Sequence, residues 1–204
     1  MAPNAEPSGV RTVDSVWAAY RHRWQSTATY SANFSQSIEI DGIGGDVDSA
    51  GSFYFARPDR MVFDYTEGQE QRVVGDGEWI WVYQPDLEQV YKVDYATAFG
   101  SGGLVALLGN RDDLSERYQL SLLDSSEDVV RLRLTPMAEV GELIELVMSA
   151  DSFDLESVVM TDPAGSVTRV EFSDIRRNLT LEDALFAFSP PEGIDVITAM
   201  PDGG

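Results

Sequence analysis

No pairing of a nucleophile with a general base is visible in this chain of 204 residues. The chain has no cysteine, which excludes a thiolate nucleophile, a disulfide scaffold and a thiolate zinc site, and its single histidine is His22. It contains no Gly-x-Ser-x-Gly, Walker or His-Glu-x-x-His motif. The adjacent carboxylates at 112–113 and 182–183 are typical of solvated turns and helix starts. The residue types therefore favour a binding protein over an enzyme, and a hydrolase is the weakest of the functions considered.

The chain is strongly acidic, with 14 Lys and Arg against 35 Asp and Glu and a formal net charge of −21. Proteins that bind nucleic acid neutralise phosphates with clustered basic residues, so no nucleic-acid partner is expected. The Gly/Asp turn from Asp41 to Asp48 lacks the closing glutamate of a calcium loop, and neither a metal nor a cofactor is expected. Adaptation to salt and docking to a basic partner both explain the charge.

The length suits a single all-β domain, which we place at 12–197, between a flexible tail at 1–11 and a C-terminal tail at 198–204. The first residues lack the basic and apolar regions of a signal peptide. The protein is therefore either cytosolic or secreted with its signal removed. The absence of cysteine is more natural outside the cytosol.

The spacing of apolar residues changes from a helical period to a strand period early in the chain. Steps of three and four predict an amphipathic helix, with Thr12 or Asp14 as its cap, through Val13, Val16, Trp17, Tyr20 and Trp24. From Tyr30 onward, alternation and Gly/Asp/Pro turns predict about eleven strands in consecutive hairpins. The apolar segment 94–110 interrupts this pattern and predicts one or two short helices.

Hairpins in this number form a meander that must curl, split or close. If the sheet curls around the helical segments, its concave face is apolar and the helices plug it. The side chains predicted to point inward are Phe34, Ile38, Met61, Phe63, Tyr65, Trp81, Leu120, Leu132, Leu146, Met148 and Phe172. Composition favours an ordinary core for this set. Gly100, Gly102 and Gly103 favour a cavity under a movable lid, because each glycine weakens a helix by roughly 1 kcal/mol relative to alanine.

Four segments carry a likeness to a known family: 51–65, with Arg-Pro before a Phe-Asp-Tyr strand; 74–89, with Asp-Gly-Glu-Trp; 104–109; and 186–193, with Phe-Ser-Pro-Pro-Glu-Gly. Together they resemble the periplasmic outer-membrane lipoprotein carriers, the LolA family of the LolA/LolB-like superfamily. The likeness extends over roughly 13–197.

The resemblance implies an incomplete, unclosed antiparallel β-barrel of about eleven strands with a helical lid over an apolar cavity. It implies a periplasmic chaperone that takes acylated lipoproteins from an inner-membrane lipoprotein-releasing ABC transporter and gives them to an outer-membrane lipoprotein acceptor. We expect a monomer. The family arginine that hydrogen-bonds the lid backbone falls on Arg57, and the lid falls within 98–108, with the side chains Phe99, Leu104, Leu107 and Leu108. This chain departs from the family at Met61, often an aromatic residue, and at Gly102-Gly103, often Thr-Pro.

Three alternatives stay open: an outer-membrane acceptor similar to LolB, a paralogue that carries another lipid, and a regulatory domain that senses lipid or lipoprotein. The acceptor requires a lipidated N-terminal cysteine, which this chain lacks.

Overall fold

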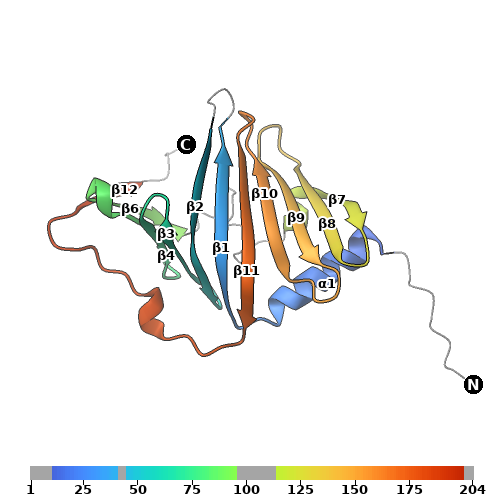
Figure 1. The fold of residues 1–204 in the computed structure, drawn as a ribbon, viewed down its shortest axis with the longest axis horizontal. Coiled ribbons are helices and arrows are strands. Elements are labelled where there is room, and N and C mark those ends of the chain that lie inside the picture. The colour runs from blue at the N-terminus through green and yellow to red at the C-terminus, as the bar shows by residue number, and fades with distance from the viewer. Residues whose placement is uncertain (1–10, 41–44, 96–113, 200–204) are drawn as a thin grey trace, which may run out of the picture.

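The computed structural model describes residues 11–40, 45–95 and 114–199. These residues form one α-helix and a 12-stranded sheet in the order β12-β6-β5-β4-β3-β2-β1-β11-β10-β9-β8-β7. All neighbouring strands are antiparallel except β12 and β6, which are parallel. Within the described ranges no pairing joins β7 to β12, so the sheet is open (Figure 1). The prediction of a mainly β, unclosed antiparallel architecture is confirmed.

The helix is α1 (Val13–Gln25). The strands are β1 (Thr29–Glu39), β2 (Asp46–Ala56), β3 (Arg60–Glu67), β4 (Gln71–Gly75), β5 (Trp79–Gln84), β6 (Gln89–Asp94), β7 (Tyr118–Ser125), β8 (Val129–Pro136), β9 (Leu143–Ser149), β10 (Leu155–Thr161), β11 (Val167–Arg177) and β12 (Asp195–Ala199). The short 3₁₀ helices are η1 (Pro85–Leu87), η2 (Leu114–Glu116) and η3 (Asp183–Phe186).

Helix α1 begins where the sequence places its cap. The Thr12 side chain accepts a hydrogen bond from the Ser15 amide, and the Ser15 hydroxyl accepts one from the Thr12 amide, a reciprocal arrangement that satisfies two exposed helix donors. Val16 and Tyr20 are buried beneath the helix, whereas His22 is exposed in its last turn. The apolar stripe of α1 therefore covers the sheet.

The sheet has two faces because successive side chains alternate. We call the face that packs against α1 the inner face. On it Phe34 pairs with Phe172 across β1 and β11, and Phe53 pairs with Phe63 across β2 and β3. One apolar cluster extends along this face, in the order of the sheet, from Ile80 on β5 to Tyr118 on β7, and it includes the buried stripe of α1.

The antiparallel order also separates the connections between strands into two ends of the sheet. The helix end holds the junction of α1 with β1 and the connections after β2, β4, β7 and β9. The far end holds the connections after β1, β3, β5, β8 and β10. In Figure 1 α1 crosses the lower ends of β10, β9 and β8, at the helix end.

The C-terminal segment was only partly predicted. The eleven expected strands correspond to β1–β11, but β12 was not expected. After β11 the segment 178–194 places Phe186, Leu185 and Phe188 against Val62 and Val74 on the outer face, before β12 joins β6. This segment gives one half of the sheet a second apolar layer.

That layer corrects the prediction for Trp81. Trp81 pairs with Val74 and packs in the outer cluster, with its ring centroid 5.6 Å from that of Phe188. Its neighbour Ile80 occupies the inner face instead. The strand from 79 to 83 is apolar on both faces because both faces are covered, so alternation could not assign Trp81 to a side.

Candidate functional site

The inner face brings together most of the side chains predicted to line a cavity. Met61, Leu132, Leu146 and Met148 are fully buried there. The others in the same cluster are Phe34, Phe63, Tyr65, Leu120 and Phe172. Ile38 is half-buried near the far end of β1. The lid residues Phe99, Leu104, Leu107 and Leu108 lie outside the described residues.

Aromatic rings form the centre of the inner face. The ring centroids of Phe53 and Phe63 are 4.5 Å apart, and those of Phe34 and Phe63 are 5.4 Å apart in an edge-to-face arrangement. Toward the far end the Tyr65 hydroxyl lies 2.9 Å from the amide oxygen of Gln36. Tyr65 thus has a satisfied polar tip, while the rings around it offer only apolar surface.

Helix α1 packs closely against the helix end of this face. Trp17 stacks on Tyr20 with ring centroids 5.5 Å apart, and the Trp24 ring lies 4.9 Å from that of Phe55. Among the described residues, the gap between the helix and the sheet has a volume of about 10 Å³. Its lining includes Tyr20, Trp24, Tyr30 and Leu155. An apolar ligand can therefore enter here only if side chains or the helix itself move.

Long-range polar contacts hold α1 at both ends. The Arg11 guanidinium donates to the carbonyl oxygens of Ser126 and Ala150, each at 3.1 Å. At the other end Arg23 donates to Asp154 at 3.0 Å, and Arg177 pairs with the same carboxylate. Sequence reasoning missed these contacts, because Arg23 and Asp154 are 131 positions apart and neither lies in a motif.

Arg57, at the turn after β2, also binds this end of α1. Its Nε donates to the Thr27 carbonyl at 2.7 Å and its Nη2 to the Trp24 carbonyl at 2.5 Å. The last carbonyls of a helix have no partner within the helix. Arg57 is a second donor to the Trp24 carbonyl, which also accepts from the Thr27 amide at 3.1 Å. Burial lowers the pKa of Arg57 from its ordinary value, but arginine stays charged. The contact predicted between Arg57 and 98–108 involves residues outside the described ranges and stays a prediction.

Three side chains of α1 carry buried polar atoms that have no hydrogen-bond partner among the described residues: Trp17 Nε1, Tyr20 Oη and Trp24 Nε1. Burial raises the pKa of the Tyr20 phenol, which therefore stays neutral and able to donate. A buried donor without an acceptor typically costs about 1–3 kcal/mol. Within the described ranges, α1 thus turns three donors without acceptors toward the sheet.

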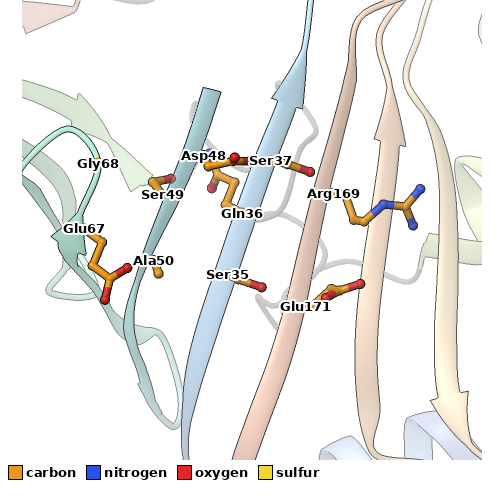
Figure 2. Close-up of a pocket in the computed structure, with 10 residues that line it drawn as sticks. All are labelled: Ser35, Gln36, Ser37, Asp48, Ser49, Ala50, Glu67, Gly68, Arg169 and Glu171. Atoms are coloured by element: carbon orange, nitrogen blue, oxygen red, sulfur yellow. The ribbon is translucent and has the colours of Figure 1, made fainter. Parts of the chain in front are cut away.

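A larger pocket, of about 430 Å³, lies on the outer face and is lined mostly by charged and hydroxyl-bearing residues. Ser35 and Ser37 alternate with Phe34 and so point away from the core, and Glu171 and Arg169 pair with them across β11. Figure 2 shows these side chains beside Asp48 and Glu67, on β1, β11, β2 and β3. Its charged and hydroxyl lining does not suit an acyl chain, so the inner face is the candidate site.

Comparisons with known proteins agree with this architecture. Residues 25–189 match the family model described as "Outer membrane lipoprotein carrier protein LolA". A protein of Halorhodospira halophila named outer-membrane lipoprotein carrier protein is 36% identical over 182 residues, 89% of this chain and 85% of its own. One of the same name from Methylococcus capsulatus is 33% identical over 172 residues, 84% of this chain and 82% of its own.

A solved structure shares the fold at low sequence identity. An uncharacterized conserved protein from Thermus thermophilus superposes with a TM-score of 0.59 at 11% identity, covering 91% of this chain and 98% of the other. In the described part of the chain, no helix has the length and apolarity that crossing a membrane requires. From the match over 25–189 and the two relatives above 30% identity, the chain belongs to the LolA family of outer-membrane lipoprotein carrier proteins.

Proposed function

We propose that this protein is a periplasmic chaperone that binds the acyl chains of lipoproteins against the inner face of its sheet. It receives them from an inner-membrane lipoprotein-releasing ABC transporter and delivers them to an outer-membrane acceptor. The observation that carries the proposal is the continuous apolar inner face of an open sheet, with one amphipathic helix packed against its helix end. Membership of a family of lipoprotein carriers supports it.

A carrier must also release its lipoprotein, so moving α1 away from the sheet must cost free energy when lipoprotein binds. Burial of acyl chains contributes about 0.8 kcal/mol per CH₂, so two or three chains would gain on the order of 30 kcal/mol. That exceeds the strongest non-covalent affinities, of about 20 kcal/mol, and would prevent release. Contacts that favour the closed, empty state must therefore offset part of the gain. The bonds that hold α1 are suited to this role.

In this scheme Arg57 holds the end of α1 in its closed position, and we call it the latch. Its two bonds to the carbonyls of Trp24 and Thr27 form only while the end of α1 lies against β2. Bonds from a charged donor contribute about 1.5–3 kcal/mol each, enough to shift the balance toward release. The predicted contact of Arg57 with 98–108 would extend the same role to the lid.

The distribution of charge supports docking to a basic membrane partner at the far end. The five connecting segments there, 40–45, 68–70, 85–88, 137–142 and 162–166, contain acidic residues and no lysine or arginine. Three of their apolar side chains are exposed, with Leu87 at 53%, Met137 at 62% and Val140 at 71% exposure. Acidic segments repel anionic lipid and attract a basic protein surface, which speeds association at low salt.

The direct test is release of a triacylated lipoprotein from membranes that contain the cognate transporter. We expect soluble lipoprotein to appear only when this protein is present, and native mass spectrometry to show a one-to-one complex. If neither lipoprotein nor an acylated peptide binds under any condition, the proposal is wrong.

A further inference from the structure

The apolar face of α1 carries three aromatic side chains that each contain a polar atom. Trp17, Tyr20 and Trp24 are spaced by three and four residues and so share one face of the helix, the face that meets the sheet. Tyr20 is only 5% exposed. All three carry a buried polar atom without a partner in the described ranges, although a phenylalanine at each position would provide an aromatic ring with no polar atom.

The chain satisfies comparable donors elsewhere. The Trp81 indole donates to Asp76 at 2.8 Å, and the Tyr65 hydroxyl bonds Gln36 at 2.9 Å. Buried polar atoms without a partner among the described residues also occur elsewhere, as at Ser157 Oγ, but on α1 three of them lie on one face of a single helix. A row of buried donors in an apolar interior is complementary to a ligand that carries acceptors along an otherwise apolar body.

We propose that Trp17, Tyr20 and Trp24 donate hydrogen bonds to the carbonyl oxygens that link the acyl chains to the lipoprotein's modified terminus. This inference rests on the proposed function and adds a headgroup subsite to it. The chains bind by burial, which distinguishes lipids poorly. The donors select chains that begin with an ester or amide carbonyl, and they place that carbonyl under α1.

The test compares two peptides with S-linked glyceryl cysteine, one carrying two ester-linked chains and the other two ether-linked chains of the same length. Ether oxygens are weaker acceptors and lack the carbonyl. We expect the ratio of the two dissociation constants to change about tenfold, or 1.4 kcal/mol, between the wild type and the triple variant Trp17→Phe/Tyr20→Phe/Trp24→Phe. The variant loses preference for the ester, while its affinity for the ether ligand stays the same.

The matched control is Trp81→Phe, which removes a donor that already has a partner, on the outer face of the sheet. It should not change the ester-to-ether ratio. The single variant Tyr20→Phe, which keeps the ring, provides the same test if the triple variant does not fold, with a smaller shift of about threefold. An unchanged ratio in the folded α1 variants would overturn the inference while leaving the carrier function intact. Failure of the wild type to bind either peptide would instead overturn the carrier function itself.

Discussion

The Nε atom of Arg57 lies 2.7 Å from the carbonyl oxygen of Thr27, so the turn after β2 holds the segment in which α1 ends and β1 begins. The Arg57 amide also donates to the Ala28 carbonyl at 2.9 Å. One residue thus binds three carbonyls along the junction on which any movement of α1 must pivot. Arg57, the latch, therefore binds the segment about which α1 would rotate.

Arg57→Leu is expected to load lipoprotein but to release it poorly. Without the guanidinium, the empty closed state loses two charge-assisted bonds, and the loaded state loses less. Affinity for an acylated peptide should rise by roughly 10-fold or more, and transfer to acceptor membranes should slow by a similar factor. The measurement is the rate of transfer from the purified loaded complex.

The matched control is Arg60→Leu, at the other end of the same turn. Arg60 pairs with Asp183 at 2.6 Å and lies over the Phe186 ring, on the outer face. Its loss should leave the transfer rate unchanged. A release rate for Arg57→Leu equal to that of the wild type would remove the latch from the account.

Leu146→Ala is expected to lower the free energy of unfolding by about 2–5 kcal/mol, because Leu146 is fully buried on the inner face. Val147→Ala, on the opposite face of β9, should cost about 1 kcal/mol or less. Urea unfolding measures both. If acyl chains occupy this face, a bound acylated peptide should narrow the difference in unfolding free energy between Leu146→Ala and the wild type. The difference between Val147→Ala and the wild type should not change. An equal change in both differences would contradict the assignment of the site.

Asp154→Asn is expected to destabilise the closed position of α1. The Asp154 carboxylate pairs with Arg23 and with Arg177, whose side chain is 11% exposed and would be left without its counter-charge. We expect a loss of about 2 kcal/mol, less than for a fully buried pair. Hydrogen exchange should accelerate in the last turn of α1. The neighbouring exposed Asp151→Asn should have little effect, and a similar loss in both variants would show that the turn's general charge matters rather than this bridge.

Asp76 gives a prediction about acid stability. Burial raises its pKa, but hydrogen bonds from the Trp79 amide, the Trp81 indole and the Glu78 amide, together with the nearby Lys92, outweigh burial and lower the pKa below its ordinary value. A lowered folded-state pKa stabilises the protein above the unfolded-state value, near 3.8, and this stabilisation disappears as the pH falls through the folded-state pKa. Asp76→Asn should therefore be less stable than the wild type at neutral pH and equally stable in strong acid. A difference in unfolding free energy that is constant with pH would exclude this linkage.

The sequence predicted those helices and strands that bury only one face, because their apolar residues recur with a regular spacing. Alternation from Tyr30 identified β1, and the spacing from Val13 to Trp24 identified α1, because each buries only one side. It failed for Trp81, where 178–194 covers the second face, and for β12, whose parallel partner β6 lies far away in sequence. The sequence also did not predict the salt bridge between Arg23 and Asp154, because these residues come together only when the chain folds.

The central claim, that acyl chains bind between α1 and the inner face, can be tested through the chain's own tryptophans. Trp17 and Trp24 face the interior, whereas Trp79 and Trp81 contact Lys92, and Trp81 packs on the outer face. A peptide with brominated acyl chains quenches only indoles close to it. We expect strong quenching in Trp79→Phe/Trp81→Phe, which keeps the inner pair, and little in Trp17→Phe/Trp24→Phe. Equal quenching in the two variants, or quenching of the outer pair alone, would contradict the account.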